Sequence, residues 1–182
     1  MLQPEESADL PDDGPVEWAP LAPYWSVLWR SWVKLARELD GEELSGLRVV
    51  ELGCGLAVPG IAAARADAVV LATDSDAEAL ELVAENARAN GVTVETAVVD
   101  WAEPHELISR GPFDLVLAAD VLYERASVAV LLSLLPRLAP EVWLADPGRP
   151  PADAFLEEAR RRHWGVETRV RDVVQIHRLQ LD

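Results

Sequence analysis

The chain has 182 residues and half of them are hydrophobic, which is ordinary for a globular core and excludes disorder over most of its length. Sixteen basic residues against 32 acidic ones give a net charge of −16, which disfavours general binding to nucleic acid. No apolar run approaches the ~20 residues that span a bilayer, and a single cysteine excludes an internal disulfide framework, so we expect a cytoplasmic protein without a membrane partner.

The start of the chain differs in composition from the rest. Residues 1–20 contain six acidic residues, no basic ones and four prolines, which predicts an acidic mobile tail without a signal peptide. Residues 21–182 are then predicted to form a single domain, because domains typically hold roughly 100–200 residues.

A tryptophan-rich helix is predicted over residues 23–40. Trp25, Trp29 and Trp32 follow the i, i+4, i+7 spacing of one helix face, and Gly41 ends the pattern. For Trp25 and Trp32 the spacing indicates an aromatic face that packs on the sheet.

A core over residues 47–182 alternates between strands and helices. Short apolar runs predict buried strands at 48–52, 68–74, 92–100, 113–120 and 141–146. Helical patterns lie at 58–66, 76–90, 127–139 and 151–164. The last segments, 166–171 and 173–181, alternate like two antiparallel strands. This order predicts an α/β fold: a Rossmann-like, doubly wound, mostly parallel seven-stranded sheet with an antiparallel C-terminal hairpin and helices on both faces.

The first candidate site is VVELGCGLAVPG at 49–60, where a strand runs into glycines and then a helix. Gly53 and Gly55 allow a ligand to approach the backbone closely, and the helix start offers free N–H groups. A dinucleotide site would need a third glycine where Val58 stands, so a nicotinamide-dependent oxidoreductase is disfavoured. A tight turn without a ligand is the alternative. Glu51, charged within an apolar strand, is explained by a cationic ligand.

Acidic residues follow the next two strands. Asp74 lies 21 residues after Gly53, where an acid accepts both hydroxyls of an unphosphorylated ribose in this architecture. The alternative role is a helix cap, for which Asp76 is the better candidate. Asp100 and Trp101 end the third strand, where they could bind an adenine amino group and cover the ring. A strand-end turn with a core tryptophan is the alternative.

The fourth strand ends in AADVLYE at 118–124. Open parallel sheets bind ligands at the carboxyl ends of their strands, so Asp120 and Tyr123 are expected at the same mouth. A half-buried loop aromatic is the alternative for Tyr123. Arg149 is expected either to meet an acidic group near this mouth or to brace its loop by a salt bridge. The three histidines lack metal-ligand spacing, so no metal site is predicted.

Together these motifs resemble the class I, seven-strand S-adenosylmethionine-dependent methyltransferases. The resemblance is carried by ELGCG, Asp74, Asp100–Trp101 and AADVLYE, and it covers residues 23–182. The D-x-x-Y end of the fourth strand is similar to one group of protein-lysine methyltransferases. PYWSVLW and ADPGR at 145–149 resemble the branch that methylates lysines of the electron-transfer flavoprotein beta subunit.

The resemblance implies S-adenosylmethionine as the cofactor, S-adenosylhomocysteine as the product, and a role for each matching residue. The cofactor-binding residues implied are Trp29, Glu51, Gly53, Cys54, Gly55, Asp74, Asp100, Trp101 and Ala119. Asp120 and Tyr123 are implied as the catalytic pair. In this role Asp120 orients the substrate amine, and Tyr123 lines and aligns the channel through which the amine enters. Cys54 is expected to be a small loop residue rather than a nucleophile.

The implied activity is methyl transfer to a protein lysine, and the implied partner is a protein substrate, with the electron-transfer flavoprotein beta subunit as one candidate. Two alternatives stay open: a small-molecule N-methyltransferase, and a non-catalytic module that binds the nucleoside cofactor. The chain is compact and has no insertion between the fifth strand and the final hairpin, which leaves the acceptor undetermined.

Overall fold

The computed structural model describes residues 24–181, which form seven strands, six α-helices and one 3-10 helix. The predicted acidic tail, residues 1–20, lies outside the described residues. The helices are η1 Tyr24–Ser26, α1 Arg30–Glu38, α2 Val58–Arg65, α3 Ala77–Ala89, α4 His105–Ser109, α5 Arg125–Leu138 and α6 Pro150–Arg161. The strands are β1 Arg48–Leu52, β2 Val69–Asp74, β3 Glu95–Val98, β4 Leu115–Ala119, β5 Glu141–Asp146, β6 Trp164–Arg171 and β7 Val174–Leu181.

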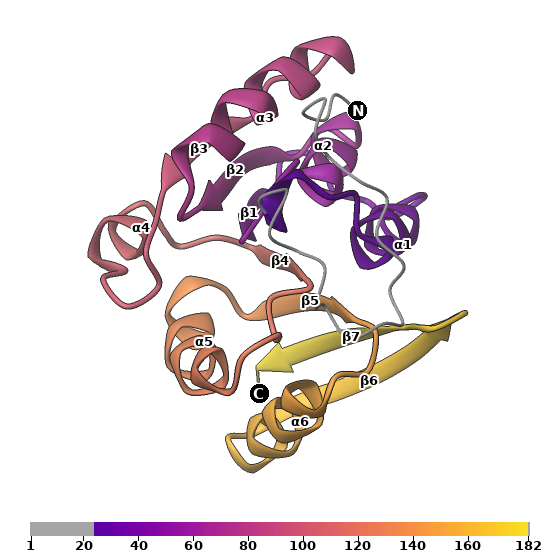
Figure 1. Cartoon of the computed structure of the whole chain (residues 1–182), viewed down its shortest axis with the longest axis vertical. Coiled ribbons are helices and arrows are strands. Elements are labelled where there is room, and N and C mark those ends of the chain that lie inside the picture. Colours follow the sequence, from indigo (N-terminus) through magenta and orange to yellow (C-terminus); the bar gives the residue numbers. More distant parts are fainter. Residues whose placement is uncertain (1–23, 182) are drawn as a thin grey trace.

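All seven strands join one sheet in the order β3-β2-β1-β4-β5-β7-β6 (Figure 1). Strands β1 to β5 pair in parallel, and β7 runs antiparallel between β5 and β6. The chain order reverses between β1 and β4, whose carboxyl ends are therefore the point where an open sheet of this kind binds ligands. The predicted fold class, with its antiparallel C-terminal hairpin, is confirmed.

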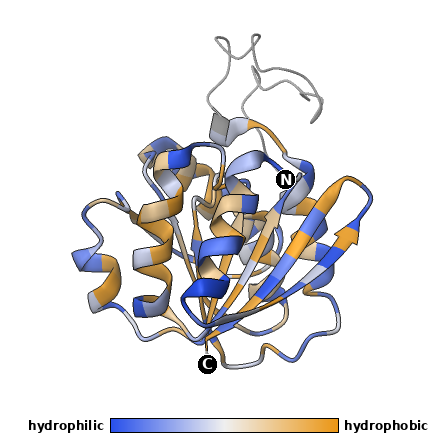
Figure 2. Cartoon of the chain, turned by 90° about the horizontal axis from the view of Figure 1, so that it is seen from below, coloured by the Kyte–Doolittle hydropathy of each residue, from blue (hydrophilic) through white to orange (hydrophobic). Residues whose placement is uncertain are grey.

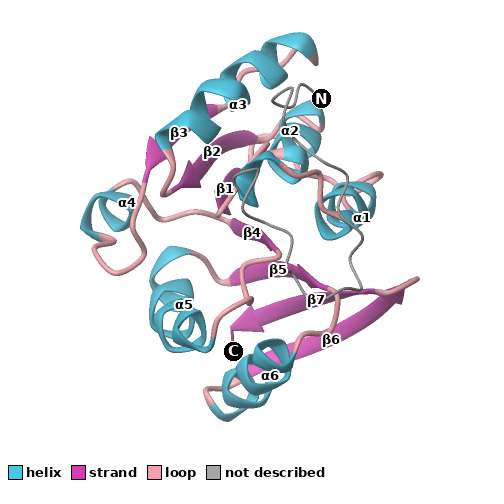
Figure 3. Ribbon diagram, viewed as in Figure 1, coloured by secondary structure: helices cyan, strands magenta, loops and turns pink. Residues whose placement is uncertain are grey.

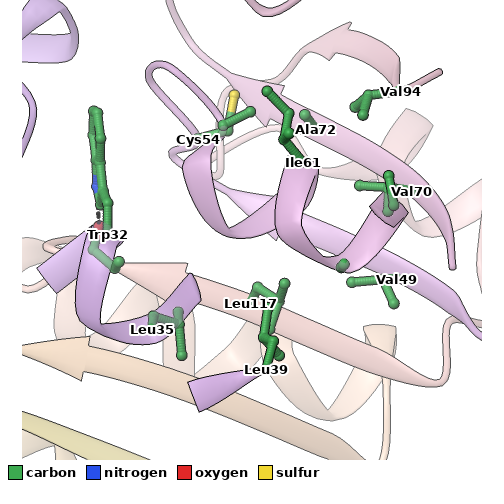
Figure 4. Close-up of a cluster of buried hydrophobic side chains, with 14 of the residues drawn as sticks. Trp32, Leu35, Leu39, Val49, Cys54, Ile61, Val70, Ala72, Val94 and Leu117 are labelled. Atoms are coloured by element: carbon green, nitrogen blue, oxygen red, sulfur yellow. Dashed lines mark hydrogen bonds between the residues drawn. The ribbon is translucent and has the colours of Figure 1, made fainter. Parts of the chain in front are cut away.

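Helices cover both faces of the sheet, with α1, α2 and α3 on one face and α4, α5 and α6 on the other (Figure 1). Successive strand residues alternate between the two layers, so Val49 packs with the first three helices and Val50 with the other three. Figure 4 shows side chains of the first layer. Along the β6–β7 hairpin, hydrophobic and hydrophilic residues alternate (Figure 2), as half-exposed strands require.

Three predicted elements differ from the structure (Figure 3), and one of them is the helix predicted at 151–164, which ends at Arg161 so that Trp164 begins β6. The helix predicted at 23–40 is divided into η1 and a nine-residue α1, because Trp29 has an extended backbone with ψ of 144°. The strand predicted at 92–100 is shortened to β3, and the five-residue α4 follows it without any periodic signal long enough to predict it. Within residues 24–181, none of the helices combines the length and the apolar composition that crossing a membrane requires.

Candidate functional site at the carboxyl edge of the sheet

The turn between β1 and α2 depends on its glycines. Gly53 and Gly55 have φ of +59° and +47°, a left-handed conformation that side chains disfavour. A Cβ on Gly53 would lie 3.2 Å from both Trp101 and Val121, and a Cβ on Gly55 would lie 2.2 Å from the Trp32 ring. The glycines therefore let the turn pack against two tryptophans that come from distant parts of the chain.

Asp74, at the end of β2, connects this turn to the next one. Its Oδ2 accepts a hydrogen bond from the Gly55 N–H at 2.9 Å, and its Oδ1 accepts one from the Asp76 N–H at 3.0 Å. Asp76 is the N-cap of α3, where its Oδ1 accepts from the Glu78 N–H at 2.9 Å. The helix cap is thus Asp76, as the sequence favours, and Asp74 keeps further lone pairs for a ligand.

Glu51 lies in β1 with 1% of its surface exposed. Its Oε2 accepts a hydrogen bond from the Gly60 N–H at 2.8 Å, and a Cβ on Gly60 would lie 2.4 Å from this oxygen. Burial, and then the charge of Asp74, raise the pKa of Glu51 to about 8. The carboxyl is therefore mostly protonated at neutral pH, and a cation placed beside it would favour the ionised form.

Cys54 is fully buried in the same turn, and its N–H donates to the Thr73 carbonyl at 2.9 Å. Burial and the nearby acids Glu51 and Asp74 raise the pKa of its thiol well above the ordinary value. A thiol kept protonated in this way is a poor nucleophile, so its role is to fill the turn.

Asp100 and Trp101 follow β3 after a short gap. Asp100 is exposed, and its Oδ1 accepts a hydrogen bond from the Ala102 N–H at 2.8 Å. Trp101 is half-buried, packs against the second layer of the core and borders Gly53. The turn that the sequence offered as the alternative is therefore present, and it still leaves the carboxylate and one part of the ring accessible.

Two indole groups, one from η1 and one from α1, connect this part of the chain to the carboxyl edge of the sheet. The Trp25 Nε1–H donates to Asp76 Oδ2 at 2.7 Å, and the Trp32 Nε1–H donates to the Ala119 carbonyl at 3.2 Å (Figure 4). Trp29 lies between them, half-buried, as the N-cap of α1. The tryptophans do not share one helix face, because Trp25 lies in η1, Trp29 precedes α1 and only Trp32 is within α1. The predicted core packing is confirmed for Trp32, which is 3% exposed in the first layer, whereas the hydrogen bonds of the two indoles were not predicted.

Asp120 directly follows β4 and points into the protein. Its backbone has φ of +60°, its N–H donates to the Ala145 carbonyl at 2.9 Å, and its side chain is 9% exposed. Oδ1 forms an ion pair with Arg149, whereas Oδ2 is buried and has no hydrogen-bond partner among residues 24–181. Burial raises the pKa of Asp120 above its ordinary value, and the Arg149 charge works against that increase.

Arg149 also contacts Asp146, the last residue of β5. Its Nη1 lies 3.2 Å from Asp146 Oδ2, while Asp146 Oδ1 accepts from the N–H groups of Gly148 and Arg149, both at 2.7 Å. Both expectations for this arginine therefore hold, since it meets the acid at the mouth and braces its own loop. Tyr123, on the loop after Asp120, is 61% exposed at the surface.

Comparisons with known proteins agree with this arrangement. A sequence model of a lysine methyltransferase family matches residues 25–143. The chain is 34% identical over 121 residues to the protein N-lysine methyltransferase METTL21A of Danio rerio, which covers 63% of this chain and 55% of that protein. It is 32% identical over 136 residues to the electron transfer flavoprotein beta subunit lysine methyltransferase of Xenopus laevis, covering 70% and 53%. The chain thus spans about half the length of these curated relatives.

A solved structure shares the fold. Magnesium protoporphyrin IX methyltransferase from Synechocystis PCC 6803, crystallised with S-adenosylmethionine, superposes with a TM-score of 0.61 at 18% identity, covering 83% of this chain and 76% of that one. The chain therefore belongs to the lysine methyltransferase family, a group of S-adenosylmethionine-dependent enzymes built on this seven-stranded sheet.

Proposed function

We propose that this chain transfers the methyl group of S-adenosylmethionine to the side-chain amine of a lysine in a protein substrate. The observation that carries the proposal is the Asp120 carboxyl, which is buried at the end of β4 with Oδ2 unpaired among the described residues. A buried acceptor left unpaired is costly, and an ammonium ligand removes that cost. Among amines, a protein lysine is favoured by the family to which the chain belongs.

The donor set at the ends of β1, β2 and β3 fits S-adenosylmethionine. Asp74 has acceptor capacity for ribose hydroxyls beyond its two backbone hydrogen bonds, and the exposed Asp100 can accept from an adenine amino group. Glu51 would hold the cationic end of the methionine part, with Gly53 and Gly55 giving that part access to the backbone. When bound, the cofactor supplies an electrophilic methyl group on a sulfonium.

The residues on the substrate side bind and orient the amine. A lysine must lose its proton before it attacks, and from a reference pKa near 10.4 this costs about 4 kcal/mol at a pH of about 7.4. The negative charge of Asp120 favours the ammonium form, so we assign Asp120 to attracting and aligning the amine. Tyr123 stands exposed on the adjoining loop and is assigned to the wall of the amine channel. Correct orientation can supply ~7–11 kcal/mol of the barrier reduction.

The electron-transfer flavoprotein beta subunit is the first protein to test as substrate. This choice is supported by the 32% identity to the Xenopus laevis enzyme that carries that subunit in its name. The EEF1A lysine methyltransferase 3 of Mus musculus is 30% identical over 77% of the chain, so EEF1A is a second candidate.

The purified chain should be incubated with S-adenosylmethionine tritiated on its methyl group, together with the purified flavoprotein subunit or with a cell lysate. The expected result is a radioactive protein band in which mass spectrometry finds methyl-lysine. A substrate acetylated on its lysines beforehand should remain unlabelled. Label confined to small molecules would contradict the protein-substrate proposal and favour a small-amine acceptor.

Two matched variants locate the activity at the proposed site. Asp120→Asn should lower turnover by roughly 100-fold, because it removes a charged hydrogen-bond acceptor worth about 1.5–3 kcal/mol, while affinity for S-adenosylhomocysteine stays within about twofold. Asp114→Asn, at the exposed amino end of the same strand, should leave both quantities unchanged. Cofactor binding without transfer to any acceptor, in the wild-type chain, would instead indicate a non-catalytic module.

A further inference from the structure

We propose that Arg149 is a positioning residue of the methyl-transfer site, which keeps the Asp120 carboxyl ionised and turned so that its Oδ2 faces the incoming amine. The inference rests on the proposed function and assigns a task to a residue outside the set implied by the family resemblance. It is carried by a series of contacts that begins at a buried turn and ends at Asp120.

The series begins at Asp146, which is completely buried at the end of β5. Two backbone N–H groups, those of Gly148 and Arg149, fix its Oδ1 at 2.7 Å each. Its Oδ2 is thereby directed to the Arg149 guanidinium, 3.2 Å from Nη1. Because Asp146 cannot move without breaking these bonds, it holds the arginine in a fixed place.

The same Nη1 of Arg149 reaches Asp120 Oδ1. An arginine can grip both oxygens of a carboxylate through its fork of N–H groups, yet here only one oxygen of Asp120 is used. The backbone of Asp120 is also fixed, by its left-handed φ and by its N–H bond to the Ala145 carbonyl. The orientation of the side chain is therefore set from both ends, and Oδ2 is the oxygen left for a ligand.

Among residues 24–181, one cation, Arg149, contacts Asp120. Arg149 approaches from the β5–α6 loop, Asp146 lies behind it, and the Ser31 hydroxyl approaches from α1. With both carboxyls ionised, this cluster has one negative charge in excess, which one ammonium group would neutralise. Burial and the charge of Asp146 raise the pKa of Asp120, whereas the charge and hydrogen bond of Arg149, and after them the Ser31 hydroxyl, lower it. Loss of the arginine should therefore leave Asp120 protonated nearer to neutral pH, with no charge for the amine.

The coupling can be measured without any substrate, by following the ¹³C resonance of the Asp120 carboxyl as a function of pH in the complex with S-adenosylhomocysteine. Asp120→Asn assigns the resonance. In Arg149→Gln the titration midpoint should rise by about 1–3 pH units, the size of a lost neighbouring charge. Arg149→Lys, which keeps the charge and is the milder change to the fold, should restore much of the difference. The matched control Arg161→Gln, on the exposed side of α6, should leave the midpoint where it is in the wild type.

The second readout is the pH profile of methyl transfer to the acceptor labelled by the wild-type chain. The acidic limb of the profile should move to higher pH in Arg149→Gln by the same amount as the carboxyl midpoint. An unchanged midpoint in both Arg149 variants, or a rate lowered by one factor at every pH, would overturn the inference. A wild-type chain that labels no acceptor would count against the proposed function alone, because the carboxyl titration does not depend on turnover.

Discussion

The two ends of the parallel strands use charged residues in opposite ways. At the amino end, Arg48 donates from its guanidinium to the carbonyls of Arg110 and Pro112, and its N–H donates to Asp114 Oδ2 at 2.7 Å. The guanidinium also lies 5.2 Å from the centre of the Phe113 ring. These side chains are exposed except for Phe113, so water screens their charges and the contacts serve to tie neighbouring turns together.

At the carboxyl end, three acids are buried, while Asp74 is half-buried and Asp100 is exposed. Glu51 and Asp146 have at most 1% of their surface exposed, Asp120 is nearly as enclosed, and burial raises the pKa of all three. Arg149 balances only part of that charge. The comparison teaches that the same kind of side chain is desolvated at the carboxyl end, where the proposed cationic ligand would meet it, and solvated at the amino end, where Asp114 is exposed.

The largest expected difference between the two ends concerns Glu51. With a pKa of about 8 in the folded chain and 4.5 as its ordinary value, its stabilising contribution is complete below pH 4.5 and is lost as the pH rises through 8. One pH unit corresponds to about 1.36 kcal/mol. Between pH 4.5 and 8, the free energy of unfolding of the wild type should therefore fall by about 5 kcal/mol relative to that of Glu51→Gln. Urea denaturation at several pH values measures this. The control Glu95→Gln, at the exposed amino end of β3, should show the same pH dependence as the wild type. If the free energy of unfolding depended on pH in the same way in wild type and Glu51→Gln, the assignment of this effect to Glu51 would be wrong.

The second prediction concerns ligand affinity. Asp74→Ala removes a charged acceptor and should weaken binding of S-adenosylhomocysteine by about 2–3 kcal/mol, or roughly 30-fold to 150-fold. Isothermal titration calorimetry gives the dissociation constant. Asp114→Ala, at the amino end of β4, should bind the ligand as the wild type does. If Asp74→Ala also bound normally, the ribose would have to lie elsewhere.

A smaller effect is expected from His177, a buried base in β7. Its Nε2 has no partner among the described residues, its Nδ1 lies 2.9 Å from Thr168 Oγ1, and burial lowers its pKa to about 4. Because the ordinary pKa is 6.5, the neutral ring contributes fully above that pH, and the contribution is lost as the pH falls towards 4. The free energy of unfolding should fall by about 1–3 kcal/mol over this pH range, after allowance for solvent screening.

His177→Gln should flatten this acid dependence when unfolding free energies are compared at pH values of about 7.5 and 4.5. His163→Gln, at an exposed position after α6, should retain the dependence of the wild type. An acid dependence that persisted unchanged in His177→Gln would assign the effect to other groups.

The smallest effect is expected at the amino end itself. Arg48→Gln removes exposed contacts with the Arg110 and Pro112 carbonyls and should lower the free energy of unfolding by about 0.5–1.5 kcal/mol, without any change in ligand affinity. Thermal denaturation with and without S-adenosylhomocysteine measures both quantities. A weakened ligand response in this variant would show that the two ends are not independent.

Much of the sheet could be predicted from the sequence because its central strands are buried on both sides. The mostly apolar β1 and the continuously apolar β4 have no competing helical pattern, and each is followed at once by glycine or aspartate. The same rule brought Asp74 and Asp120 to one edge, since carboxyl ends of neighbouring parallel strands must meet. Asp76 as the cap of α3 followed from local chemistry alone.

The contacts that link distant segments could not be predicted. Helical spacing placed Trp25 and Trp32 on one face, but the hydrogen bonds to Asp76 and Ala119 depend on where β2 and β4 end in space. For the same reason, the sequence did not decide whether Arg149 meets an acid near the mouth or braces its own loop. In the structure it contacts both Asp120 and Asp146. A five-residue helix such as α4 is shorter than two turns and carries no period to detect.

The indole groups around the glycine turn have an optical consequence. Trp25 and Trp32 donate hydrogen bonds to residues at the ends of β2 and β4, and Trp101 borders Gly53, so three fluorescent indole groups lie around the region assigned to the cofactor. Occupation of that region should quench or shift their ultraviolet fluorescence. The chain thus contains its own reporter of ligand arrival, which allows rapid-mixing measurements on unlabelled protein.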